Sequence, residues 1–391
     1  MTRASPRSFT RSLRARALPL PRRERRRTSR AAKAVSASIP ISAEQPVARR
    51  PVRVVAIGGG TGLSTLLRGL KKYVIPPGVA RIAQTTFAIA ELAAVVTVTD
   101  DGGSSGRLRQ ELNMLPPGDI RNCMVALSED EALLSRLFQH RFTGKGPLEG
   151  HNFGNLFLAA LTSVTGDFAE AVRESSQILA SRGHIYPSTT SNVQLDAWMD
   201  DGSRVRGETR ITASKQRIVE LRMVPANAQP LPQTLDAIAQ ADLITMGPGS
   251  LFTSLVPNVL VRGIPEAIAA SRAKKVFVCN LMMQANESLG LTASEHILAI
   301  RRHARMKLFD YALVNNAPVS PELLHRYQSE GSGQVACDAE KIEAMGVQCI
   351  AENLLDEGEV VRHNTHKVAL RLMELAFAPA AARPQAAAVT V

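Results

Sequence analysis

Two glycine-rich stretches of the sequence could bind phosphate through their backbone. The stretches are Gly58, Gly59, Gly60, Thr61 and Gly62, and Gly247, Pro248, Gly249 and Ser250. Each follows an apolar run and precedes a segment with helical spacing, which in the second case opens with hydroxyl residues that include Thr253. Glycine lets backbone N–H groups approach an anion closely, and the N-terminus of a helix attracts negative charge. The repeated pattern predicts one extended anionic ligand between the two loops.

The first loop does not match a standard nucleotide fingerprint. The third glycine of a dinucleotide motif would fall at Leu63, and no acidic residue follows at the spacing expected for a ribose-binding carboxylate. A Walker A loop would need a lysine after its last glycine, which is absent here. This argues against a nicotinamide dehydrogenase, and a single glycine-rich turn of this kind can also be purely structural.

Two adjacent carboxylates, Asp100 and Asp101, follow the apolar run AVVTVT. We predict that both face the first glycine loop across the crevice. A carboxylate beside phosphates repels them unless it holds a hydroxyl group or a Mg²⁺ ion that bridges to the phosphates, so one of the pair should be a metal or sugar ligand. The alternative is an Asp-Gly turn, with Ser104 or Ser105 capping the next helix.

Further polar residues lie near these loops in the expected fold. Arg107 and Arg109 of the helix after Asp101 could reach an anion. Asn280 ends the apolar run VFVC, where an amide suits base or sugar recognition, and Asn155 joins it in our predicted ligand-binding set. His151 has no evident catalytic partner, so we expect it to be a structural, hydrogen-bonded residue.

Strand-like and helical segments alternate along most of the chain, which predicts an α/β fold: a Rossmann-like open parallel sheet with helices on both faces and a small antiparallel β insertion. The predicted strands are uniformly apolar, as is typical of strands buried on both faces. The Rossmann-like domain should comprise residues 51–181 and 226–376, and the insertion residues 182–225, where an Asp-Gly turn separates two alternating runs. We expect disordered tails at 1–50 and 377–391.

The net charge of +12 lies entirely in residues 1–50, which hold 14 Lys and Arg against 2 Asp and Glu. The other residues carry no net charge, which argues against a nucleic-acid partner. The basic segment resembles a transit peptide in composition, and a twin-arginine signal is a weaker alternative, but we favour a dispensable tail. No apolar run is long enough to span a membrane, and the four unclustered cysteines fit a reducing compartment.

Five ordered motifs resemble those of the gluconeogenesis factor family, a relative of the 2-phospho-L-lactate transferase of deazaflavin coenzyme biosynthesis. The motifs are AIGGGTGLSTLLRGL, AVVTVTDDGGSSGRLRQEL, LPPGDIRNCMVAL, GHNFGNLFLAALT and MGPGSLFTSLVPNVLV, and the resemblance spans residues 52–376. It implies a cytoplasmic bacterial protein that binds a nucleotide sugar such as UDP-N-acetylglucosamine and supports cell shape and growth on gluconeogenic carbon sources. It also implies that the two glycine loops hold the diphosphate, and that Asp100 and Asp101 correspond to metal-associated acids of the transferase.

The chain departs from the family pattern in three places. One is Asn364, where the family tends to carry Asp after the late His, and the other two lie near the expected site. Residues 75–92 add length that we expect beside the binding crevice, and Leu291 replaces a tyrosine that could stack on a base. We expect a binding protein without turnover, with no membrane partner; a homo-oligomer is compatible with the sequence. The alternative is a transferase that uses Asp100 or Asp101 with Mg²⁺ to move a phospholactyl group from a nucleoside diphosphate to a deazaflavin.

Overall fold

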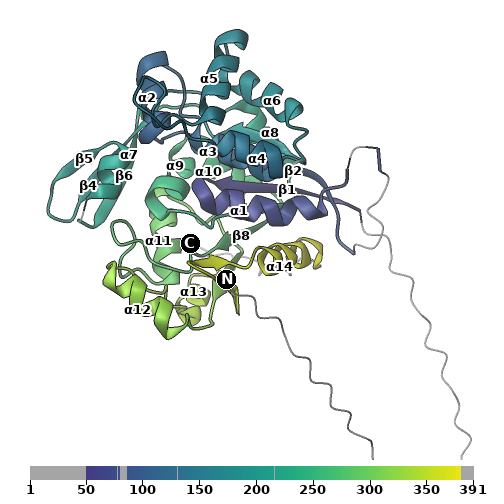
Figure 1. Ribbon diagram of the computed structural model, residues 1–391. Coiled ribbons are helices and arrows are strands. Elements are labelled where there is room, and N and C mark those ends of the chain that lie inside the picture. The colour runs from purple at the N-terminus through teal and green to yellow at the C-terminus, as the bar shows by residue number, and fades with distance from the viewer. Residues whose placement is uncertain (1–49, 77, 80–85, 130, 215, 380–391) are drawn as a thin grey trace, which may run out of the picture. The chain divides into compact units, whose positions relative to one another are not determined.

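The structure is a computed structural model that describes residues 50–76, 78–79, 86–129, 131–214 and 216–379. Our predictions for the two tails therefore fall almost entirely outside the described residues. Seven parallel strands form one sheet, in the order β10-β9-β8-β7-β1-β2-β3 (Figure 1). Their bounds are β1 Val52–Gly58, β2 Ile89–Val96, β3 His184–Pro187, β7 Leu243–Met246, β8 Lys274–Val278, β9 Tyr311–Asn315 and β10 Gln348–Glu352.

The strand order reverses between β1 and β7, and this reversal creates the place for a ligand. From β1 the chain continues to β2 on one side, whereas from β7 it continues to β8 on the other. The connections after β1 and β7 therefore diverge and leave a crevice at the carboxyl ends of these two strands, which is where open α/β sheets bind ligands. The two predicted glycine loops follow these two strands.

Helices cover both faces of the sheet, as expected (Figure 1). On one face α1 packs against α3 and α14, and on the other α10 packs against α8 and α9. The helices up to the insertion are α1 Gly60–Leu70, α2 Gly103–Leu112, α3 Gly118–Leu127, α4 Glu131–Gln139, α5 Phe153–Thr165 and α6 Phe168–Ile178. Those after it are α8 Pro232–Gln240, α9 Val256–Leu260, α10 Ile264–Ala270, α11 Ala293–Ala304, α12 Pro321–Ser329, α13 Ala339–Ala344 and α14 Thr365–Phe377. Short turns of other helical types are η1 Lys71–Tyr73 and η2 Leu251–Leu255.

A separate antiparallel sheet, in the order β5-β4-β6, follows the main helical region. Its strands are β4 Gln194–Met199, β5 Arg204–Arg206 and β6 Ile218–Val224, with α7 Glu208–Ala213 between the last two. Two details differ from our expectation. Residues 184–187, which we assigned to the insertion, form β3 of the main sheet, and the segment ETRI forms a helix because Gly207 turns the chain away from β5 at a φ of +92°.

The described ends of the added segment at 75–92 do not lie beside the crevice as we expected, and residues 77 and 80–85 fall outside the described residues. Its last residues, Ile89–Leu92, belong to β2, and Ile75 donates its backbone N–H to the Ile89 carbonyl. Ile89 pairs with Val52, the first residue of β1, so the described flanks lie at the amino ends of the strands, opposite the glycine loops. A hairpin of β11 Leu355–Glu357 and β12 Val361–His363 completes the fold. Among the described helices, none is both long and apolar enough to cross a membrane.

Candidate functional site

The two glycine loops touch each other and line one cavity of about 420 Å³. A Cβ atom placed on Gly62 would lie only 2.3 Å from the carbonyl oxygen of Pro248, so glycine is required for the loops to approach this closely. The lining residues that we predicted from the sequence are Gly59, Gly60, Thr61, Gly62, Pro248, Gly249, Ser250 and Asn280. The parallel sheet thus brings together two loops that lie nearly 190 residues apart in the chain.

Side chains from the loop after β8 hold the second glycine loop in place. Asn280 accepts a hydrogen bond from the Gly249 N–H through Oδ1 (2.9 Å) and donates one to the Gly249 carbonyl through Nδ2 (2.7 Å). Gln284 donates to the Ser250 hydroxyl at 2.7 Å. Glu287 accepts bonds from the Phe252 N–H and the Thr253 hydroxyl at the start of η2. These bonds fix the conformation of the second glycine loop, whose outer edge faces the cavity.

Acidic groups lie behind the first glycine loop. The Asp119 carboxyl is next to Gly59, where an added Cβ would meet it at 2.7 Å, and it accepts a hydrogen bond from the Gly60 backbone. Burial, together with the nearby charge of Asp100, raises the pKa of Asp119 to about 7. Burial also raises the pKa of Glu208, with Asp100 and Asp119 adding to the effect. Protonation of these acids would remove negative charge from behind the first glycine loop.

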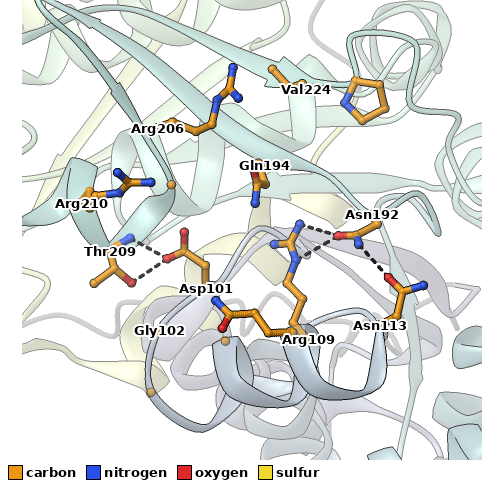
Figure 2. Close-up of a pocket in the computed structure, with 15 residues that line it drawn as sticks. Asp101, Gly102, Arg109, Asn113, Asn192, Gln194, Arg206, Thr209, Arg210 and Val224 are labelled. Carbon is orange, nitrogen blue, oxygen red and sulfur yellow. Dashed lines mark hydrogen bonds between the residues drawn. The ribbon is translucent and has the colours of Figure 1, made fainter.

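Asp100 and Asp101 point in different directions. Asp100 accepts the Gly102 N–H through Oδ1, and its Oδ2 lies against Gly118, near Asp119. Asp101 accepts bonds from the Thr209 N–H (2.8 Å) and hydroxyl (2.6 Å), so it stabilises the start of α7, as Figure 2 shows. Our prediction that both face the first glycine loop is therefore wrong for Asp101.

This divergence bears on the predicted magnesium site. Within the ranges that the structure describes, no group of three His, Cys, Asp or Glu side chains is arranged to hold a metal ion. The carboxylates of Asp100 and Asp101 do not converge on one point, so the pair does not fit a shared Mg²⁺ ion.

Comparison with known proteins agrees with this architecture. A family model described as 2-phospho-L-lactate transferase CofD matches residues 54–355. The chain belongs to the CofD family. The gluconeogenesis factor of Bacillus subtilis is 45% identical over 324 residues, which cover 83% of this chain and 98% of that protein. The gluconeogenesis factor of Halalkalibacterium halodurans is 46% identical over 322 residues, covering 82% and 95%.

A solved structure shows the same fold within this set of relatives. The crystal structure of a UPF0052 family member from Bacillus halodurans is 44% identical in sequence, with a TM-score of 0.77. The alignment covers 83% of this chain and 100% of the chain in that structure. The CofD-family fold and our expectation of a Rossmann-like sheet are thus confirmed.

Several residues that we predicted to contact a ligand lie beside the cavity of this CofD-family chain without lining it. Gly58 ends β1 and Gly247 follows β7. Both make backbone hydrogen bonds to neighbouring segments and do not line the cavity. Thr253 is buried and bonded to Glu287. Asn155 lies farther off, where it donates to the Ser105 hydroxyl and accepts from Arg121.

Two cap predictions near α2 also differ from the structure. Gly102 occupies the N-cap of α2, and neither predicted serine caps it. Ser104 instead bonds to His151 Nδ1 at 3.2 Å and accepts the Asn152 N–H, so the histidine is buried and structural, as expected. Serine inside the first turn leaves its hydroxyl available to neighbouring helices, so the local sequence pattern alone did not identify its role.

Sequence reasoning missed the residues that close the far side of the cavity. Tyr327 of α12 and Arg362 and His363 of β12 line it, together with Gln284. Leu291 does not line it, so the aromatic residue available to a ligand is Tyr327. His363 bonds through Nε2 to the Cys279 carbonyl, and burial lowers its pKa to about 4. Tyr327 and Arg362 belong to no recognisable motif, and only the fold brings them to the loops.

Proposed function

We propose that this chain is a cytoplasmic gluconeogenesis factor that binds a nucleotide sugar of the UDP-N-acetylglucosamine kind without turning it over. One observation carries the proposal: the two glycine loops meet at the reversal of strand order and line a single cavity. Its volume of about 420 Å³ lies within the usual range for small-molecule sites. The diphosphate would lie on backbone N–H groups of the two loops other than those of Gly60 and Gly249, which already donate to Asp119 and Asn280. The two attached groups would extend to either side.

The other lining residues supply the contacts that such a ligand needs. Arg362 offers a guanidinium to the diphosphate, and Tyr327 offers an aromatic face to a base. The amides of Asn280 and Gln284 lie at the same edge and can bond to hydroxyl or carbonyl groups. This combination of anion cradle, aromatic ring and amides supports the proposed ligand class.

The lining also favours binding over catalysis. Of the described residues that line the cavity, none is an Asp, Glu, Lys or Cys, and Asp119 lies behind the first loop rather than in the lining. His363 is held in its neutral form by burial and is already bonded to a carbonyl group. A general acid and base pair needs two titratable groups of suitable pKa close to the reacting atoms. We infer that a bound state, read by another component of the cell, supports cell shape and growth on gluconeogenic carbon sources.

The alternative is a phospholactyl transferase, which the description of the matching family model favours. It would require Asp100, the one member of the carboxylate pair near the first loop, to take part in the reaction.

Titration calorimetry of the full chain separates these two functions. We expect saturable binding of UDP-N-acetylglucosamine in the presence of EDTA, lost on Gly249→Glu, and no product after prolonged incubation. Tight binding of GDP only with Mg²⁺, abolished by Asp100→Asn, would support the transferase instead.

A further inference from the structure

A second and larger pocket opens between α2 and the antiparallel sheet (Figure 2). Its volume is about 730 Å³, and its lining shares no residue with the cavity between the glycine loops. Most of the side chains that line the pocket are polar, and three of them are arginines. Arg109, Arg206 and Arg210 line it, against the single carboxylate of Asp101, which is already bonded to Thr209. Figure 2 shows the three arginine side chains around the same space.

Arg109 is the central group because it is buried and incompletely bonded. Only 7% of its surface is exposed. Its Nε and Nη2 groups both donate to Asn192 Oδ1, and Nη2 also donates to the Val193 carbonyl. Its Nη1 group is buried and has no hydrogen-bond partner in the described part of the chain. Figure 2 shows this group directed away from Asn192, toward the side of the pocket where Asp101 lies.

A buried guanidinium with an unused donor is costly unless an acceptor completes its bonding. Two bonds to Asn192 fix the plane of this guanidinium, and Nη1 is left buried and without a partner at the edge of the pocket. An anionic oxygen placed there would accept a charge-assisted hydrogen bond, the strongest kind available to this group.

Two more arginines are available to the same ligand. Arg210 is exposed, and in the parts of the chain that the structure describes it makes no hydrogen bond or ion pair. Arg206 and Arg204 both bond to the buried carboxylate of Asp196, and the distance from Arg206 Nη2 to Asp196 Oδ2 is 3.2 Å. Other donor groups of Arg206 remain exposed. Among the lining residues, three guanidinium groups thus face one carboxylate, that of Asp101, while Asp100 and Glu208 act on Arg109 from outside the lining.

The rest of the lining indicates what kind of anion fits. Side-chain amides of Gln110, Asn113, Asn192 and Gln194 surround the arginines. Amides both donate to and accept from hydroxyl groups, and they add no charge. Gly102 and Gly103 at the start of α2 also line the pocket, and a Cβ on Gly103 would meet nothing within 4 Å, so backbone is accessible there.

We propose that this pocket is a second ligand site, separate from the nucleotide-sugar site, that binds a small phosphorylated sugar or a similar polyhydroxylated phosphate. The phosphate accepts hydrogen bonds from Arg109 Nη1 and Arg210, and the amides bond to the hydroxyl groups. The inference does not depend on the proposed function, because the two pockets have different linings.

Calorimetric titration of the full chain with glucose 6-phosphate tests the proposal directly. We expect saturable binding that is unchanged when the protein is first saturated with UDP-N-acetylglucosamine. Arg210→Gln should weaken it about tenfold or more, the loss expected for one charge-assisted bond. Arg217→Gln is the matched control. Arg217 is exposed, directly precedes β6 and does not line the pocket.

Two further titrations define the ligand class. Glucose, which lacks the anion, and inorganic phosphate, which lacks the hydroxyl groups, should each bind at least about tenfold more weakly than glucose 6-phosphate. Arg109→Lys keeps the charge but loses the fixed donor geometry, and it should also weaken binding. Thermal melting confirms that each variant is folded, and Arg210→Gln decides the matter if Arg109→Lys fails to fold.

Four results would overturn the proposal. They are the absence of saturable glucose 6-phosphate binding, equal affinity in Arg210→Gln, displacement by UDP-N-acetylglucosamine, and inorganic phosphate binding as tightly as the sugar phosphate. If UDP-N-acetylglucosamine itself fails to bind, the proposed function fails, while the titrations with glucose 6-phosphate alone still decide the second site.

Discussion

Replacing Gly62 by alanine tests whether contact between the two glycine loops forms the binding site. A Cβ at this position would lie 2.3 Å from the Pro248 carbonyl oxygen and 2.7 Å from its carbonyl carbon. Both are backbone atoms, so no side-chain rotation can relieve the overlap. Ordinary contacts of this kind begin at 3.4 Å, so the second loop would move by roughly 1 Å to admit the methyl group.

The substitution should weaken binding while the protein remains folded. Overpacking of this size costs about 1–3 kcal/mol. Alanine in place of glycine returns about 1 kcal/mol, because residue 62 lies in α1. The net loss in the free energy of unfolding is then roughly 0–2 kcal/mol. A shift of one loop, however, separates the two halves of the diphosphate cradle. We expect affinity for UDP-N-acetylglucosamine to fall at least about tenfold, or about 1.4 kcal/mol.

Calorimetry measures the affinity, and thermal melting measures the stability of the same samples. Gly58→Ala is the matched control, because its Cβ would meet the nearest heavy atom at 3.5 Å, an ordinary contact, and Gly58 does not line the cavity. The control should bind normally. Wild-type affinity in Gly62→Ala would refute the idea that close approach of the loops creates the site.

Three further substitutions test separate parts of the account. Asp119→Asn should raise the free energy of unfolding at pH 8 by at most about 4 kcal/mol and should not raise it at pH 4. The reason is that the raised pKa of Asp119 makes the stability of the wild-type protein fall between about pH 4 and 7. The same pH dependence of the melting temperature in the variant and the wild type would contradict this. Asn280→Ala removes both bonds to Gly249 and should weaken nucleotide-sugar binding about tenfold in calorimetry. Asp101→Ala should lower stability by about 1 kcal/mol through loss of its bonds to Thr209, with nucleotide-sugar affinity unchanged.

The main sheet was predictable where its strands are buried on both faces. β1, β2, β7, β8 and β9 read as continuous apolar runs, and two of them lead into glycine loops. β10 was missed because it is an edge strand whose residues are half-buried or exposed, so it lacks such a run. β3 is short and ends at a proline, and only its pairing with β2 identifies it.

The candidate site was predictable in its backbone but not in its surroundings. The loops of Gly59–Gly62 and Pro248–Ser250 carry a local signal, since clustered glycines between a buried strand and a helix are typical of an anion-binding turn. No local sequence signal predicts the orientations of Asp100 and Asp101. β2 ends at Val96, and the loop that follows determines the direction of each side chain independently. Tyr327 and Arg362 reach the cavity only because α12 and β12 fold back beside it.

A co-crystal of the full chain with UDP-N-acetylglucosamine tests the central claim most directly. The account predicts density for the diphosphate between Gly60–Gly62 and Gly249–Ser250, with the base near Tyr327. Density for the ligand elsewhere, such as beside Arg109 and Arg210, would contradict the assignment of the nucleotide-sugar site to the glycine loops.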